Sequence, residues 1–177
     1  MKNLNYKNKI YYILIISLAL LFQNCELFGD DNDIPQFPEA TQTGKGTFGF
    51  KLNGEIINVT NTSDQVAIYQ SGILQLAAGV TNKTYKNEIQ IILEDPLQIN
   101  KKYSLDNFPK YVSKYIDYNN IINCDYEYSD TYEGTIIFSK IDKENYIISG
   151  TFEFSTKKDG CEDIKITQGV FDLKYIP

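Results

Sequence analysis

The sequence feature that most constrains the fold is a pair of two-residue turn signals near the start of the globular part. Asn53-Gly54 separates two stretches rich in strand-forming residues, 47–52 and 55–60, and Ser71-Gly72 has a similar setting. A type I′ turn needs positive φ at both central residues, which Asn-Gly supplies readily. Each signal therefore predicts a tight antiparallel hairpin.

The rest of the chain continues this pattern of short apolar strands separated by polar turns. Apolar residues alternate over 88–93, and a hairpin is expected from 134–141 and 146–156. A last pair of strands is expected between Ile164 and Tyr175. Many short strands at regular spacing predict an all-β domain, an antiparallel β-sandwich, with an open β-barrel as the alternative.

The segment 101–123 fits two kinds of secondary structure. Its apolar residues fall at helical spacing, and Pro109 would suit the first turn of a helix. Its tyrosines and valine also favour a strand, near 113–117, so the residues alone leave both alternatives open. We further expect a strand to open at Cys124, with Tyr126 and Tyr128 on one face and acids on the other.

The first residues have the pattern of a bacterial lipoprotein signal. Three lysines precede an apolar run from Ile10 to Phe22, which is too short to cross ~30 Å of hydrocarbon as a helix. Cys25 follows, and the small-x-small site of an ordinary secretory signal does not precede it. We therefore expect residues 1–24 to be cleaved and Cys25 to be lipidated, so that acyl chains hold the protein at the membrane.

Residues 25–44 are expected to form a flexible acidic tether, because they contain too few apolar side chains to build a core. Acidic residues just after an acylated cysteine also resemble the surface-export signal of Bacteroidota-type lipoproteins. The sequence TGKGT at 43–47 lacks the spacing of a phosphate-binding loop, so we expect only a flexible lead-in to the first strand. A single β domain is then expected over 45–177.

The composition excludes several kinds of chemistry and partner. The net charge is −6, and every basic residue is a lysine. An acidic surface argues against nucleic acid as a partner. The absence of His and Arg removes His-based nucleophilic catalysis and bidentate phosphate clamps. Carboxylate pairs, Ser-Lys pairs and calcium ligands have no recognisable spacing, so we assign no catalytic residue, metal or cofactor.

Two further groups of residues are candidates for structural or binding roles. Cys124 and Cys161 are the only cysteines left once Cys25 is acylated, so an exported domain is expected to join them in a disulfide. Tyrosines flanked by acids and amides could stack on sugar rings, although tyrosines are also ordinary half-buried strand residues. The candidate ligand surface consists of Tyr111, Tyr115, Tyr126, Tyr128 and Tyr132.

Both ends of the domain resemble a family of uncharacterised Bacteroidota envelope lipoproteins. The motifs that carry the resemblance are TGKGTFGFKLNG (43–54), SGTFEF (149–154) and ITQGVFDLKY (166–175). The resemblance implies an all-β domain with a strand around Tyr115. It implies no catalytic or binding residue.

These observations favour an acyl-anchored lipoprotein of the outer membrane, on its periplasmic or cell-surface face, with a non-catalytic binding or scaffolding domain. Its expected partners are the membrane, through the anchor, and a glycan or an envelope protein. A carbohydrate-binding module using the tyrosines is the first alternative. A hydrolase using carboxylates is the second and less favoured one.

Overall fold

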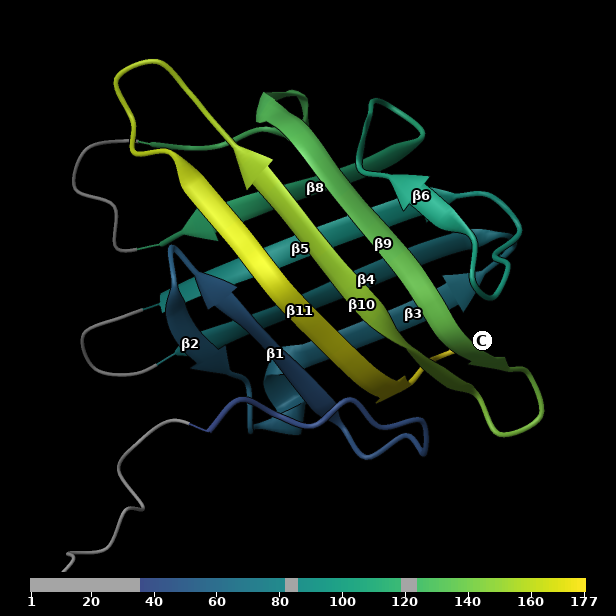
Figure 1. Cartoon of the computed structure of the whole chain (residues 1–177). Coiled ribbons are helices and arrows are strands. Elements are labelled where there is room, and N and C mark those ends of the chain that lie inside the picture. Colours follow the sequence, from purple (N-terminus) through teal and green to yellow (C-terminus); the bar gives the residue numbers. More distant parts are fainter. Residues whose placement is uncertain (1–35, 82–85, 119–123) are drawn as a thin grey trace, which may run out of the picture. The chain divides into compact units, whose positions relative to one another are not determined.

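Two antiparallel sheets form the computed structural model, which describes residues 36–81, 86–118 and 124–177 (Figure 1). The six-stranded sheet has the order β2 (Glu55–Asn58), β1 (Thr47–Leu52), β11 (Ile164–Lys174), β10 (Ile147–Thr156), β9 (Thr131–Asp142) and β6 (Lys102–Ser104). The five-stranded sheet has the order β3 (Gln65–Gln70), β4 (Ile73–Thr81), β5 (Lys86–Glu94), β8 (Tyr111–Asp117) and β7 (Asp106–Asn107). In the described residues neither sheet closes into a barrel, so the predicted all-β sandwich is confirmed.

The two short helical turns in the described part are η2 (Thr62–Asp64) and η3 (Tyr128–Asp130). Among the described residues, no helix has both the length and the apolar character needed to span a membrane. The predicted signal peptide, 1–24, and the predicted lipidation site, Cys25, lie outside the described residues.

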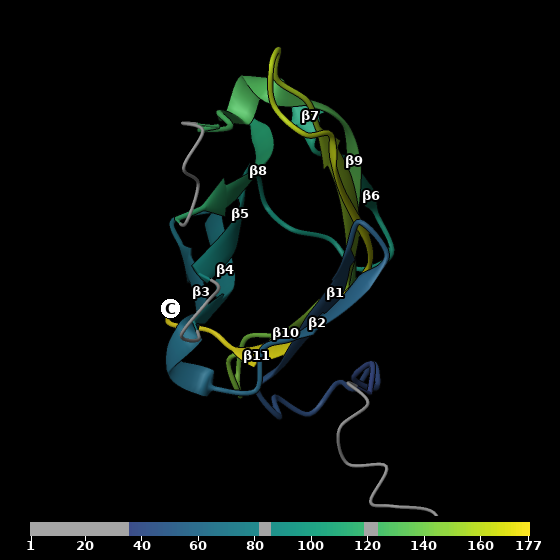
Figure 2. The ribbon, with the colours of Figure 1, turned by 90° about the vertical axis from the view of Figure 1, so that its left-hand side faces the viewer.

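The sheets face each other with crossing strands, and their inner faces form the core (Figures 1 and 2). Alternation explains which side chains point inward: Ile89, Ile91 and Leu93 of β5 are fully buried. Buried phenylalanines of the six-stranded sheet pack with ring centroids between 5.4 and 6.4 Å apart. These rings are Phe48, Phe50, Phe138, Phe152 and Phe171. Each buries a large apolar area, about 1.5–3 kcal/mol relative to exposure.

Both predicted hairpin turns are present. Asn53 and Gly54 have φ of 48° and 94°, and Ser71 and Gly72 have φ of 52° and 83°. These are the positive values that a type I′ turn requires. The local conformational demand of the turn residues therefore explains the first four strands.

The described part of the ambiguous segment, 101–118, contains strands β6, β7 and β8, so the helical alternative is wrong. β8 pairs with β5 along its length, and Tyr115 lies opposite Ile89 on the inner face. Pro109 lies between β7 and β8 after a cis peptide bond, and not in a helical turn. Pairing with β5 uses the backbone groups of β8 and places its alternate side chains in the core, which outweighs the helical spacing.

Two strand predictions are wrong. No strand opens at Cys124, because local capping turns the chain into η3: Asp130 Oδ2 accepts a hydrogen bond from the Glu127 N–H at 2.8 Å. The expected last pair of strands is the single strand β11, with an irregularity around Gln168, whose φ is 54°. The register of β11 shifts there against both neighbours, between Gly49 and Lys51 of β1 and between Phe152 and Phe154 of β10.

The C-terminal residues tie the two sheets together at one edge. After β11 ends in the six-stranded sheet, Ile176 pairs with edge strand β3 of the other sheet. Its N–H donates to the Ala67 carbonyl and its carbonyl accepts from the Tyr69 N–H, each at 2.9 Å. This pairing satisfies backbone groups that an open sheet edge would leave exposed.

The end of the predicted tether is attached to the domain by Asp172. This aspartate lies in β11 on the outer face of the six-stranded sheet, where it is fully buried. Its carboxylate accepts hydrogen bonds from the N–H groups of Thr43, Gly44 and Lys45 at 2.8–3.2 Å. It also accepts from the hydroxyls of Thr41 at 2.6 Å and, from β10, Ser149 at 2.7 Å.

The Asp172 carboxylate and its five donors form a cradle that holds residues 41–45 against the sheet. The glycines of the TGKGT sequence have positive φ, at 73° for Gly44 and 75° for Gly46, and the loop binds a carboxylate of its own chain. Described residues before 45 also contact the domain. Pro38 packs so closely on Gly49 that a Cβ at that glycine would lie 2.4 Å from the Pro38 ring.

Burial of Asp172 raises its pKa, but the hydrogen bonds from Thr41, Ser149, Gly44 and Thr43 together exceed that effect and lower the pKa to about 2. The unfolded carboxyl therefore binds a proton before the folded one does as the pH falls. The stability contributed by this difference is fully present above pH 4 and is lost between about pH 4 and pH 2.

Replacing Asp172 by asparagine should lower the free energy of unfolding at pH 7 by about 3 kcal/mol, because an amide NH₂ would face N–H and O–H donors. The difference between wild type and variant should shrink by roughly 2 kcal/mol as the pH falls from 4 to 2. Urea unfolding across this pH range measures both effects. Asp163→Asn, at an exposed carboxylate, is the control and should change little. A difference that stays constant down to pH 2 would contradict the assigned role of Asp172.

Candidate functional site

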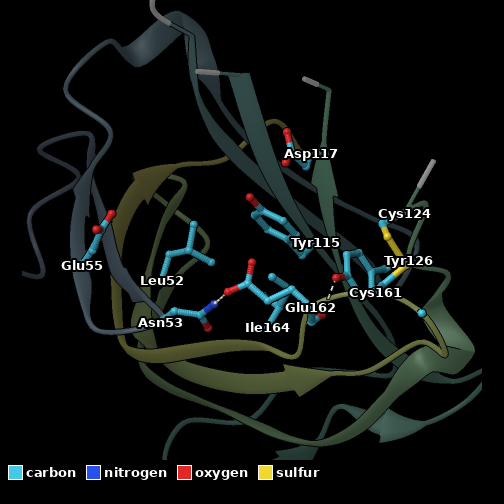
Figure 3. Close-up of a pocket in the computed structure, with 11 residues that line it drawn as sticks. Leu52, Asn53, Glu55, Tyr115, Asp117, Cys124, Tyr126, Cys161, Glu162 and Ile164 are labelled. Atoms are coloured by element: carbon cyan, nitrogen blue, oxygen red, sulfur yellow. Dashed lines mark hydrogen bonds between the residues drawn. A yellow bond between two sulfur atoms is a disulfide. The ribbon is translucent and has the colours of Figure 1, made fainter. Parts of the chain in front are cut away.

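A pocket of about 450 Å³ opens at one end of the sandwich, between the ends of the two sheets (Figure 3). Strands β1 and β11 contribute Leu52 and Ile164, and β8 contributes Tyr115 and Asp117. Strand β2 contributes Glu55, and the remaining lining residues come from turns and loops: Asn53, Cys124, Tyr126, Gly160, Cys161 and Glu162. The pocket thus has apolar side chains in its wall and several polar groups around them.

The turn residue Asn53 positions one wall of the pocket. Its side-chain amide donates to Glu162 Oε1 at 2.8 Å, and its side-chain oxygen accepts from the Lys165 N–H at 2.8 Å. The Asn53 N–H also donates to the Lys165 carbonyl at 2.9 Å. The residue that makes the first hairpin turn therefore also fixes the Glu162 carboxylate at the pocket (Figure 3).

Two tyrosines form the inner part of the pocket wall. Tyr115 and Tyr126 are each only 4% exposed, and their ring centroids lie 6.1 Å apart. The Tyr126 hydroxyl donates to the Glu162 backbone carbonyl, and the Asn87 side-chain amide donates to the Tyr115 oxygen at 3.4 Å. Burial, with the nearby carboxylate of Glu162, raises the pKa of Tyr126, so this hydroxyl stays protonated and keeps donating.

The predicted disulfide is present beside these tyrosines. Cys124 and Cys161 are bonded, with their Cα atoms 5.7 Å apart. The bond joins the segment before η3 to the loop before β11, and both cysteines line the pocket (Figure 3). It therefore holds together two loops that the sheets themselves do not connect.

The charged groups of the pocket are all acidic in the described part of the chain. Carboxylates come from Glu55, Asp117 and Glu162, and lysines are not among the described lining residues. Within 36–81, 86–118 and 124–177, no group of three carboxylates or cysteines is placed to hold a metal ion. The pocket therefore suits an organic cation or a hydrogen-bond donor better than an anion.

The five predicted tyrosines do not form one surface. Tyr115 and Tyr126 line the pocket from within the core, whereas Tyr111 packs on Tyr103 and donates to Asp95 Oδ2 at 2.7 Å. Tyr128 donates to Gln90 on the outside of the five-stranded sheet at 2.8 Å, and Tyr132 is 48% exposed elsewhere.

The acidic pocket residues were not found from the sequence. Glu55, Asp117 and Glu162 lie far apart in the chain, and none belongs to a recognised motif. The one usable signal was Asn53, whose turn brings Glu55 to the end of the sheet. Among the acids near Tyr126 and Tyr128, Asp130 has a local structural role, because it caps η3.

Loss of the disulfide should lower the free energy of unfolding by about 2–4 kcal/mol, measured by urea unfolding of Cys161→Ser. The double variant Cys124→Ser/Cys161→Ser should match the single variant, which shows that the free thiol of Cys124 is not the cause. A reductant should lower the urea midpoint of wild type to that of the variants, and it should leave the midpoints of both variants unchanged. Unchanged stability of the reduced wild type would contradict a structural role for the bond.

Comparison with known proteins identifies a family of similar sequences. Neither the curated proteins nor the solved structures contain a significant match to the chain. A family described as a domain of unknown function, DUF6252, matches residues 61–173, from η2 to nearly the end of β11. The match includes the pocket residues Tyr115, Asp117 and Glu162 and leaves out the hairpin that carries Asn53. Because the match covers more than half of the sequence, the chain belongs to the DUF6252 family.

Proposed function

We propose that this protein is an acyl-anchored lipoprotein of the cell envelope whose β domain is a non-catalytic binding module. Its end pocket would bind the alkylammonium group of a partner, such as a lysine side chain or another primary amine. The observation that carries this proposal is the all-acidic set of charged groups around a partly apolar pocket.

The lining of the pocket fits the two parts of such a ligand. Leu52 and Ile164 offer apolar contact to an alkyl stem, and the aromatic edge of Tyr115 extends that surface. The ammonium group would lie near the Glu162 and Asp117 carboxylates. Ligand sites commonly combine a mainly apolar wall with a few placed polar groups, and long cationic side chains bury their stems in this way.

The walls are held before any ligand arrives, which supports a binding role. Asn53 fixes Glu162, and the disulfide fixes the loops on both sides of Tyr126. A preformed site loses little conformational freedom when it binds its ligand.

The anchoring part of the proposal rests on the sequence of 1–25. The lysines, the short apolar run and Cys25 support lipidation, and the acidic, proline-containing segment that follows supports display away from the membrane. We place the protein at the outer membrane, with the envelope as the source of its partner.

Nα-acetyl-lysine amide should bind the full chain in detergent micelles, and Glu162→Gln should weaken this binding about tenfold, because a charged pair is lost while the acceptor for Asn53 is kept. Calorimetric titration measures the affinity. The matched control is Glu153→Gln, an acid outside this pocket, which should leave the affinity unchanged. Norleucine amide acetylated in the same way, which lacks the ammonium group, should bind much more weakly. Equal binding of both ligands, or no effect of Glu162→Gln, would contradict the proposed site.

Replacing Cys25 by serine should abolish incorporation of an alkyne-labelled fatty acid and move the protein out of the membrane fraction, because no acyl chain remains. Cell fractionation and in-gel detection of the label give the two results. Cys161→Ser should keep both the label and the membrane location. Membrane retention of Cys25→Ser at wild-type level would show that the anchor lies elsewhere.

A further inference from the structure

A second concave site lies on the five-stranded sheet, away from the acidic end pocket. It is a groove of about 300 Å³ over β4 and β5, beside the end of β8. The residues that line it and matter for its chemistry are Ser63, Asp64, Thr81, Lys86, Glu88 and Tyr118. None of these six lines the end pocket.

Small residues on β4 make the sheet hollow at this place. On the outer face, Gly79 lies opposite Glu88 and Ala77 lies opposite Gln90. A Cβ at Gly79 would lie 2.2 Å from the Asn87 carbonyl oxygen, so no larger residue fits there without moving backbone. The register of the two strands therefore places small residues of β4 beside the long side chains of β5, and this difference in size forms the floor of the groove.

An aromatic ring stands at the edge of this floor. Tyr118 is 50% exposed, and its N–H donates to the Lys86 carbonyl at 3.0 Å, which continues the pairing of β8 with β5. Its hydroxyl donates to Glu88 Oε2 at 3.1 Å. The ring is thus held at both ends while half of the side chain stays accessible.

A row of hydrogen bonds orders the polar groups beside the ring. Gln90 donates to Glu88 Oε1 at 2.7 Å, and Tyr128 donates to Gln90 Oε1 at 2.8 Å. Together with the bond from Tyr118, these contacts connect two tyrosines through one carboxylate and one amide. Fixed acceptors next to an aromatic ring are the groups that a polyhydroxylated ring requires.

The charge of the groove differs from that of the end pocket. Lys86 balances one of the two acids, Asp64 and Glu88, and the hydroxyls of Ser63 and Thr81 are neutral. The Lys86 ammonium lies 4.5 Å from the centre of the Tyr118 ring. Because Lys86 is exposed, its ammonium can leave the ring face and donate to a ligand hydroxyl. Mixed charge with many hydrogen-bonding groups suits a neutral, hydroxyl-rich ligand.

We propose that this groove is a glycan-binding site, in which a neutral sugar ring stacks on Tyr118 and its hydroxyls bond to Glu88 and Lys86. The site does not depend on the amine-binding pocket or on Cys25. None of the five tyrosines predicted from the sequence lines this groove, and Tyr128 is connected to it only through Gln90 and Glu88.

The test uses the full chain in micelles of a detergent without a sugar headgroup, titrated with cello-, manno-, chito- and maltotetraose. At least one tetrasaccharide should bind, and Tyr118→Ala should weaken that binding about tenfold, because the stacking surface is removed. Tyr118→Phe keeps the ring and should retain most of the affinity. Glu88→Gln should weaken binding several-fold through loss of a charged acceptor.

Tyr132→Ala is the matched control, because Tyr132 is 48% exposed and lies outside the groove. It should leave sugar binding unchanged, and its melting curve and that of Tyr118→Ala should both resemble wild type. Three results would overturn the proposal: no tetrasaccharide binds at about 10 mM, a concentration that detects even weak sites; Tyr118→Ala has no effect; or Tyr132→Ala weakens binding equally. Glu162→Gln should weaken only the binding of the amine and leave sugar binding unchanged. A failure of the glycan proposal can therefore be distinguished from a failure of the amine proposal.

Discussion

The hydrogen-bonded carboxylate of Asp172 is the interaction on which the six-stranded sheet depends. Burying an ionised group is expensive unless its oxygens are fully bonded. Five donors from the N-terminal segment and β10 meet this requirement. Asp172 pairs with Thr47 of β1 on one side and Ser149 of β10 on the other, so the carboxylate joins the centre of the sheet to the segment that covers it. The aromatic core lies on the opposite face of the same strands.

The same physical logic recurs at the end pocket with different groups. Asn53 uses its backbone for a turn and its side chain to hold Glu162, while the disulfide fixes the neighbouring loops. In both arrangements, polar groups from distant segments bond to one another. These bonds restrict the conformations of the segments that they join. Among the pocket acids, Glu162 is therefore held at a defined position, as a preformed ligand site would require.

Local signals made much of the fold predictable. The positive φ required at Asn53-Gly54 located one hairpin, and alternation located β5 and β10. The disulfide followed from having only two cysteines left to pair.

The features that the sequence did not predict depend on distant partners or on competing local hydrogen bonds. Asp172 and Thr41 are 131 positions apart, so nothing near either residue showed the cradle. The acids that alternate with Tyr126 and Tyr128 suggested a strand, but the Asp130 carboxylate instead bonds to the Glu127 N–H and turns the chain.

The tyrosines that cluster in the sequence lie apart in the structure for a geometric reason, which also explains why there are two candidate sites. Successive side chains of a strand point to opposite faces, so Tyr115 and Tyr118, three positions apart, cannot share one. Tyr115 points inward, where Asn87 donates to it, and Tyr118 points outward, where it donates to Glu88. Asn87 and Glu88 are neighbours on β5. One strand pair, β5 with β8, therefore supports the end pocket from its inner face and the groove from its outer face. Tyrosines that are close together in the sequence thus lie on opposite faces of the sheet.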